Sequence, residues 1–133
     1  MSRHEVVVVG GGPAGLSAAI ELRARGVHVT VLEREQEAGG IPRHTDHLGY
    51  GLRDLHRLTT GPRYAARLVR AAEKAGVDLR TGVTVTGIDG LDVQVATSSG
   101  PEQIRAAAVV LATGVRERPR SARLVPGDRP AGV

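Results

Sequence analysis

Three residue types with strong chemical signatures are absent from this chain, which has no cysteine, no tryptophan and no phenylalanine. Without cysteine the chain can form no disulfide, no thiolate–metal site and no redox-active cysteine pair of its own. Aromatic residues make up 2% of the sequence and consist of Tyr50 and Tyr64. A hydrophobic core must therefore be built from Val, Leu, Ile and Ala, and few rings are available to stack on a flat ligand.

Long hydrophobic runs are also missing. The N-terminal run Val6–Val9 is followed at once by glycines. It is far shorter than the roughly 20 apolar residues of a membrane span, and shorter than the apolar region of a signal peptide. We therefore expect a cytoplasmic protein that does not engage a membrane.

Lysine is nearly absent, since Lys74 is the only lysine among 18 basic residues, and the formal net charge is +4. The arginines are spread along the sequence, alternate with acidic residues and have no aromatic residues beside them. Nucleic-acid-binding proteins concentrate basic residues on one face and often add aromatic stacking platforms. We therefore expect no nucleic-acid partner and regard the phosphates of a small cofactor as the anions to be bound.

The N-terminal stretch has the order strand, glycine loop, helix and strand of a βαβ unit. The β-branched run Val6–Val9 predicts a buried parallel strand, and Pro13–Arg25 has apolar residues at helical spacing. Pro13 suits a first helical turn, and Gly26 suits a helix C-terminus. Val27–Leu32 predicts the second strand.

The rest of the chain is less regular. From Glu33 to Gly61 there is no periodicity, which is typical of a functional or disordered loop. A helix is predicted over Pro62–Ala75 and a short strand over Val77–Leu79. Residues 83–107 alternate in polarity between turn signals, which predicts a small antiparallel meander. Its strands are expected at Val83–Ile88, Leu91–Ala96 and Glu102–Ala106, with a further buried parallel strand at Val109–Ala112.

These elements predict an α/β fold, with a Rossmann-like parallel sheet into which a small antiparallel β-meander is inserted. A length of 133 residues suits one domain. We assign residues 1–114 to this domain. Residues 115–133 are rich in Arg and Pro and lack periodicity, so we assign them to a tail or linker.

The hexapeptide Gly10-Gly11-Gly12-Pro13-Ala14-Gly15 fits the pattern G-x-G-x-x-G and lies between a predicted strand and a predicted helix. The first glycine of the pattern permits a tight turn, the second lets the backbone approach a pyrophosphate, and the third lets helix and strand pack closely. The helix N-terminus adds N–H groups and a positive dipole end. Glu33 closes the second strand, where it can accept hydrogen bonds from ribose hydroxyls and would repel a 2′-phosphate. The motif predicts a dinucleotide site, and the alternative is a glycine turn without a ligand.

Other polar groups are less informative. Thr113-Gly114 ends a predicted parallel strand, where ligands of α/β sheets bind. His44 and His47, with Asp46 and Asp54 nearby, lie in a loop without a second ordered pair of ligands, so we expect no metal. No pair of residues has the pattern of an acid–base or nucleophilic centre, and the catalytic residues stay unassigned.

The stretch VVVVGGGPAGLSAAIELRARGVHVTVLERE resembles the FAD fingerprint of two-dinucleotide-domain flavoproteins, the pyridine nucleotide-disulfide oxidoreductase-like group. In that group a Glu that ends the second strand binds the adenosine ribose, a Gly-Gly pair follows, and an Ala-Thr-Gly strand end lies near the FAD. The stretches GGIPRHTDHLGYGLRDLHRL and LATGVRERPRSARLVPGDRPAGV are similar to the flavin subunits of amine- and opine-oxidising dehydrogenases, which include sarcosine-oxidase-alpha-like and cyanide-synthase-like proteins.

The resemblance implies an FAD site built from the glycine loop, the end of the second strand, the loop after it, the meander and the last strand. Its residues would be Gly10, Gly12, Pro13, Ala14 and Gly15 at the pyrophosphate, Glu33 and Arg34 at the adenosine, Gly40, Ile41 and Arg43 along the cofactor toward the flavin, Val85 at the adenine, and Ala112, Thr113 and Gly114 closing the pocket.

The chain also departs from the group. Its members continue with a second glycine fingerprint for NAD(P)H and then return to complete the FAD domain with a Gly-Asp motif. Neither feature is present, because Gly127-Asp128 belongs to the Arg/Pro-rich tail. The sequence therefore resembles the N-terminal portion of a flavin-dependent oxidoreductase that would use NAD(P)H or an amine-type substrate when complete.

We expect the chain alone to be inactive and to associate with a second subunit or with the missing C-terminal half. Two alternatives stay open. The chain could be a standalone module that binds NAD or FAD, or a truncated product without catalysis of its own.

Overall fold

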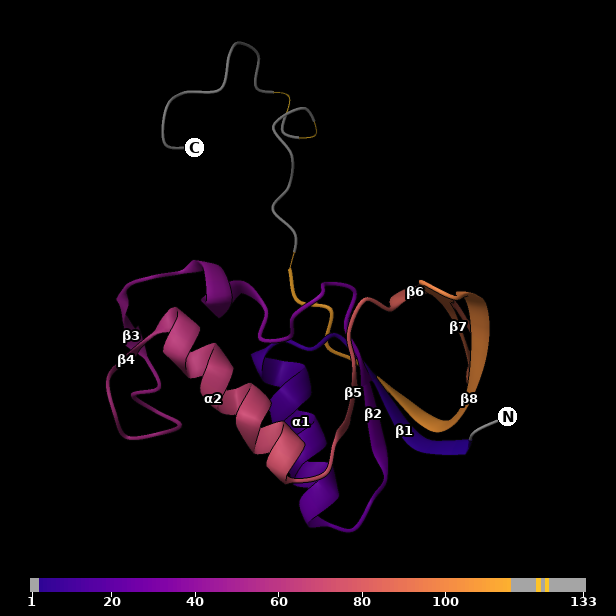
Figure 1. Ribbon diagram of the computed structural model, residues 1–133, viewed down its shortest axis with the longest axis horizontal. Coiled ribbons are helices and arrows are strands. Elements are labelled where there is room, and N and C mark those ends of the chain that lie inside the picture. Colours follow the sequence, from indigo (N-terminus) through magenta and orange to yellow (C-terminus); the bar gives the residue numbers. More distant parts are fainter. Residues whose placement is uncertain (1–2, 116–121, 123, 125–133) are drawn as a thin grey trace.

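The computed structural model describes residues 3–115, 122 and 124, so the predicted tail lies almost wholly outside the described residues. No helix in this described part is long and apolar enough to cross a membrane. The elements in Figure 1 are β1 (Arg3–Val9), α1 (Pro13–Ala24), β2 (Val29–Leu32), the 3-10 helix η1 (Ile41–His44), β3 (Leu48–Tyr50), β4 (Thr59–Thr60), α2 (Gly61–Lys74), β5 (Asp78–Arg80), β6 (Thr84–Asp89), β7 (Asp92–Thr97) and β8 (Gly100–Leu111).

A six-stranded sheet with the strand order β5-β2-β1-β8-β7-β6 forms the centre of the molecule. β1 pairs in parallel with β2 on one side and with β8 on the other, and β5 pairs in parallel with β2. β6, β7 and the first half of β8 form an antiparallel meander. The predicted α/β fold, a Rossmann-like parallel sheet with a small meander, is confirmed.

Both faces of the parallel sheet are covered, which explains why β1 reads as an unbroken apolar run. Neighbouring residues of a strand point to opposite faces. On one face Val8 packs in a core with Leu16 of α1 and Ala72 of α2. On the other face Val7 packs in a second core with Val93 of the meander. Figure 1 shows the two helices on one side of β1 and β2 and the meander on the other.

β8 is one long strand, and the expectation of two separate strands at Glu102–Ala106 and Val109–Ala112 was wrong. Its first half pairs with β7 as far as Arg105, and from Arg105 onward it pairs with β1. No glycine or proline interrupts residues 102–111, so one strand can pass from the meander into the parallel sheet. The far end is also less buried than expected, since Leu111 is 66% exposed.

The segment between β2 and α2, predicted to lack regular structure, contains η1 and the two-stranded sheet of β3 and β4. The two tyrosines of the chain connect this segment to α2. The rings of Tyr50 in β3 and Tyr64 in α2 lie 5.7 Å apart between centroids, and the Tyr64 hydroxyl donates a hydrogen bond to Asp54. Such short elements are fixed by contacts with α2 rather than by any periodicity of their own, so the sequence pattern did not reveal them.

The Tyr64–Asp54 contact predicts an unusual tyrosine titration. Burial, and then the hydrogen bond to Asp54 and the charge of that carboxylate, raise the pKa of Tyr64 from 10.0 to about 12. Because folding raises this pKa, the stabilisation is present below pH 10.0 and is lost as the pH rises through about 12. We expect the tyrosinate absorbance to show one group that ionises near pH 12, absent in Tyr64→Phe. Ionisation of Tyr64 near pH 10.0 would contradict this.

Candidate functional site

The glycine motif forms the turn between β1 and α1, at the carboxyl edge of the parallel sheet. Two of its glycines are required by the packing of the chain itself. Gly10 has a φ of +109°, and a Cβ there would collide with the carbonyl of Ala112 after β8. A Cβ on Gly15 would collide with the carbonyl oxygen of Gly10. These two positions keep β1, α1 and β8 close together independently of any ligand.

Gly12 is different, because the fold itself would accept a side chain there. Its φ of −81° and ψ of −175° are extended backbone that any residue adopts. The nearest heavy atom to an added Cβ would be the Cα of Gly40, at the ordinary van der Waals distance of 3.8 Å. The absence of a side chain therefore leaves an opening at the start of α1 that the packing of the chain does not require.

The N-terminus of α1 is not capped by a side chain of its N-cap residue or its first turn. The helix begins at Pro13, its N-cap residue Gly12 supplies no side-chain hydrogen bond, and its first turn contains no acidic residue. The first N–H groups and the positive end of the helix dipole therefore suit an external anion. Together with the opening at Gly12, this end of α1 has the shape and the charge to hold a phosphate.

The carboxylate of Glu33 joins the end of β2 to the glycine loop. One oxygen accepts a hydrogen bond from the Gly11 N–H at 2.9 Å, and the other accepts one from the Glu35 N–H at 2.9 Å. The residue is buried, with 8% of its surface exposed. A carboxylate has about four lone-pair positions, so both oxygens can still accept bonds from ligand hydroxyls.

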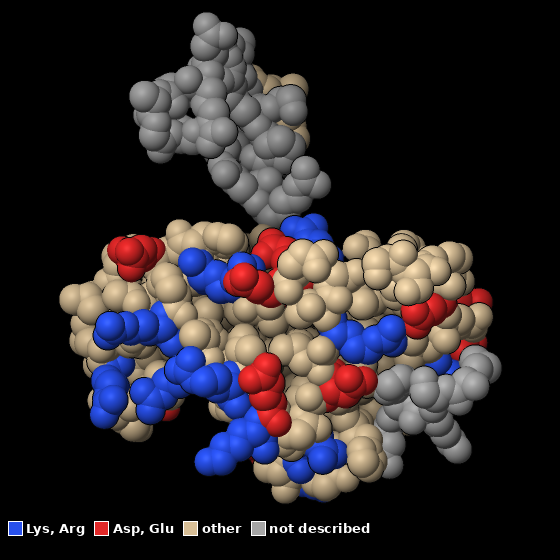
Figure 2. Space-filling view, viewed as in Figure 1, with Lys and Arg blue, Asp and Glu red and all other residues tan. Residues whose placement is uncertain are grey.

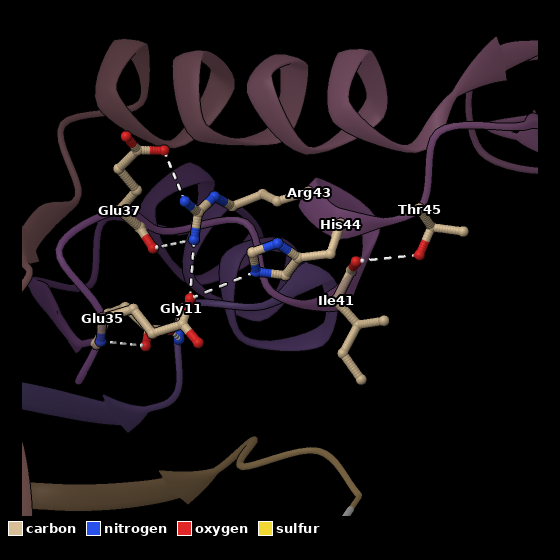
Figure 3. Close-up of polar contacts among 8 residues, drawn as sticks. Gly11, Glu35, Glu37, Ile41, Arg43, His44 and Thr45 are labelled. Atoms are coloured by element: carbon tan, nitrogen blue, oxygen red, sulfur yellow. Dashed lines mark hydrogen bonds and ion pairs between the residues drawn. The ribbon is translucent and has the colours of Figure 1, made fainter. Parts of the chain in front are cut away.

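Arg43 in η1 forms contacts that stabilise the loop that follows Glu33 (Figure 3). Its guanidinium forms ion pairs with Glu35 at 2.8 Å and with Glu37 at 2.7 Å. Its methylene groups lie so close to Gly39 that a Cβ there would be 2.9 Å from them. In this position Arg43 shapes the loop that carries Gly40, and its predicted place beside a flavin stays a prediction.

Several of the predicted site residues meet at the carboxyl edge of the sheet. A Cβ on Gly40 would lie 2.9 Å from the Cα of Gly12, so these two backbones are in close contact. Ala112 lies against Gly10, and its N–H donates a hydrogen bond to the carbonyl of Val9 at 2.9 Å. The loop after β2, the glycine loop and the end of β8 therefore form one continuous surface.

The other predicted residues lie around this surface. Val85 is in β6, which starts beside the end of β2, because the Val83 N–H donates a hydrogen bond to the Glu33 carbonyl at 2.9 Å. The exposed members of the predicted site set are Ala14, Arg34, Ile41, Thr113 and Gly114.

The histidines of the loop have separate surroundings. His44 lies 3.9 Å from Glu35, whereas His47 stacks on Tyr50 with ring centroids 5.7 Å apart. Asp54 is bonded to the Tyr64 hydroxyl. Among the described residues, no three His, Asp or Glu side chains come together as a metal site would require.

Two backbone donors that hold Glu33, those of Gly11 and Glu35, were not expected from the sequence. The signal for Gly11 was present, because glycine also fills a variable position of the motif. A Cβ on Gly11 would lie 3.0 Å from Oε2 of Glu33 and 3.2 Å from the Cβ of Ala38. A side chain there would displace the carboxylate.

The fold and the site together define the class of dinucleotide-binding Rossmann-type proteins. The sequence matches the family model of the NAD(P)-binding Rossmann-like domain over residues 8–75, and that of the pyridine nucleotide-disulphide oxidoreductases over residues 50–128. The chain belongs to the pyridine nucleotide-disulphide oxidoreductase family.

Named relatives support this membership. The chain is 36% identical over 121 residues to hydrogen cyanide synthase subunit HcnB of Pseudomonas protegens, covering 84% of this chain and 24% of the relative. It is 32% identical over 132 residues to an opine oxidase subunit of Rhizobium meliloti, covering 87% of this chain and 24% of the relative. The chain therefore spans about a quarter of the length of these relatives.

Solved structures of similar fold include L-proline dehydrogenase from P. horikoshii, with a TM-score of 0.72 and 26% identity over 85% of this chain and 23% of that chain. Another is the atypical thioredoxin reductase of Desulfovibrio vulgaris, with a TM-score of 0.65 and 29% identity over 87% of this chain and 38% of that chain. With the family membership, these likenesses identify the chain as an FAD-binding part of an oxidoreductase.

Because Glu33 accepts two backbone hydrogen bonds, we expect it to stabilise the fold even when no cofactor is bound. Glu33→Gln keeps the size of the side chain but turns an NH₂ donor toward one of the two backbone donors. We expect the free energy of unfolding in urea to fall by about 1–3 kcal/mol, the usual cost of an unsatisfied buried polar group. The control is Glu37→Gln, whose exposed ion pair with Arg43 should be worth at most about 1 kcal/mol. An equal loss in the two variants would contradict the structural role of Glu33.

Proposed function

We propose that the glycine loop, the N-terminus of α1 and Glu33 bind the adenosine diphosphate part of FAD. The observation that carries the proposal is the opening at Gly12, where the nearest atom to an added Cβ would be 3.8 Å away. Packing requires Gly10 and Gly15 to be glycine but does not require Gly12. A pyrophosphate that approaches the backbone there, at the positive end of α1, accounts for the glycine at position 12.

The other parts of the cofactor follow from this placement. Glu33, already oriented by two backbone N–H groups, accepts hydrogen bonds from the adenosine ribose and disfavours a 2′-phosphate. Arg34 lies beside the adenosine, and the backbone of Val85 faces the adenine. Gly40 and Ala112 border the pyrophosphate, because both contact the glycine loop. The remaining residues of the proposed pocket are Pro13, Ala14, Ile41, Arg43, Thr113 and Gly114.

For the whole protein we propose a flavin-dependent oxidoreductase of the cytoplasm. The bound FAD would supply the redox chemistry, and the residues of this chain would hold and orient it. The electron donor of the whole protein would be NAD(P)H or an amine-type substrate. The names of the hydrogen cyanide synthase and opine oxidase subunits support the amine-type substrate, and the matched NAD(P)-binding and pyridine nucleotide family models support NAD(P)H. A nucleotide-binding module without catalysis of its own is the second candidate, since the described residues include no recognisable catalytic pair.

We also propose that a strand from elsewhere in the protein, or from a second subunit, completes the sheet at β8. The pairing of β8 with β7 ends at Arg105, whereas its pairing with β1 continues to Leu111. Within the described residues, no strand lies on the other side of positions 107–111. An open strand edge of this kind is a site for pairing with another chain segment.

The Gly12 proposal predicts that cofactor binding and folding can be separated by two matched substitutions. Gly12→Ala should leave the free energy of unfolding within about 0.5 kcal/mol of the parent. It should weaken FAD binding by about tenfold or more, because the methyl group occupies the place of the pyrophosphate. Gly15→Ala should instead destabilise the fold, because its Cβ collides with the Gly10 carbonyl. The measurements are FAD fluorescence anisotropy and urea unfolding. Unchanged FAD affinity in Gly12→Ala would reject the proposed placement.

The open edge of β8 predicts association of the isolated chain. We expect sedimentation of the purified chain to show oligomers that form as its concentration rises, and a broad unfolding transition. Replacing Leu111 by proline should reduce the oligomers, because it removes a backbone donor of the open edge. The N–H of the next residue, Ala112, donates to Val9 of β1, so the alternating N–H of Leu111 points away from β1. A chain that stays monomeric and unfolds in one sharp transition would contradict the proposal.

A further inference from the structure

Helix α2 carries an uninterrupted line of positive charge on its outer face. Arg63, Arg67, Arg70 and Lys74 follow one another at spacings of four, three and four residues and are all exposed. With 3.6 residues per turn, these spacings place the four side chains on one side of the helix, opposite the side that buries Ala65 and Ala72. Figure 2 shows the Lys and Arg side chains gathered in a band over α2 and the neighbouring loop. We call these four residues the α2 cation row.

The cation row has no acidic partner within the part of the chain that the structure describes. The ion pairs found there involve other cations, such as Arg25 with Glu21 and Arg105 with Asp92. Like charges three and four residues apart destabilise a helix. No ion pair among the described residues neutralises the row. The fold therefore gathers on one helix face charges that are scattered in the linear sequence.

A recess of about 640 Å³ runs along one flank of the same helix. Its apolar lining includes Ala66 and Val69 of α2 and Leu79 of β5. The charged residues that line it are Arg70 of the α2 cation row, Glu73, Glu37 and Arg43. A pocket that is partly apolar and lies beside fixed charges suits an amino-acid side chain, since interface anchors fill such pockets. It offers nothing specific to a repeating phosphate backbone.

We propose that the outer face of α2 binds an acidic segment of a second polypeptide. Carboxylates of that segment pair with the α2 cation row, and one apolar side chain enters the recess. Charge complementarity of this kind sets the orientation of partners and the rate of their encounter. The α2 cation row lies outside the residues proposed for the cofactor site, and the recess shares Arg43 with them. The proposal does not depend on FAD being bound.

Two other anionic partners fit this face less well. An interfacial membrane helix needs large apolar residues beside its cations, whereas the exposed apolar residues of α2 are Ala66 and Ala71. Binding of single-stranded nucleic acid uses aromatic stacking, and Tyr64, the aromatic residue of α2, is buried with 7% of its surface exposed.

The test uses labelled poly-L-glutamate as the acidic polypeptide, with binding followed by fluorescence anisotropy in about 0.15 M salt. The test variant is Arg67→Gln/Arg70→Gln. Its matched control is Arg25→Gln/Arg105→Gln, which removes the same amount of charge from α1 and β8. We expect the first pair to weaken binding roughly tenfold and the second pair to leave it nearly unchanged. Circular dichroism of both variants checks that α2 remains folded.

Parallel titrations use phosphatidylglycerol vesicles and a DNA duplex. The proposal is supported when two results are found together. Poly-L-glutamate binds more tightly than the other two probes, and only the double variant in α2 weakens its binding. It is overturned by absent binding, by an equal loss in both double variants, or by tighter binding of vesicles or duplex. None of these outcomes depends on FAD, so the α2 proposal and the cofactor proposal fail independently.

Discussion

The buried carboxylate of Glu33 is the contact on which the arrangement of the site depends. It ends β2, and its two oxygens accept the N–H groups of Gly11 in the glycine loop and of Glu35 in the next loop. Two segments that lie 22 residues apart in the sequence are thus fixed around one charged group. Arg43 extends the arrangement by pairing with Glu35 and Glu37, which sets the path of the chain toward Gly40. A carboxylate already oriented in this way can bind ribose hydroxyls without further ordering.

The glycines of the loop divide into those that the fold needs and one that it does not. Gly10 and Gly15 allow β1, α1 and the end of β8 to touch, and Gly11 leaves room for the Glu33 carboxylate. Gly12 has space for a side chain, so packing does not explain its glycine, whereas the proposed contact with a pyrophosphate would. On this proposal the same loop closes the structural core and opens the cofactor site.

The sequence predicted the parts of the fold that have a local signal. The valine run of β1, Pro13 at the start of α1 and the glycine turns indicated the βαβ unit and the meander, because each depends on nearby residues. It did not predict the single strand β8, whose continuity comes from successive pairing with β7 and β1. The Tyr50–Tyr64 contact and the line of charge on α2 were also missed, since both arise only when distant or helically spaced residues come together.

The central claim is that the glycine loop and Glu33 bind the adenosine diphosphate part of the cofactor. The most direct test is a titration of the ¹⁵N-labelled chain with ADP, followed by amide NMR chemical shifts, because ADP probes this half of the site without the flavin. The account predicts that the largest shifts fall on residues 10–16 and on the amides of Gly11 and Glu35 beside the Glu33 carboxylate. Shifts confined to another surface, or no shifts with saturating ADP, would contradict it.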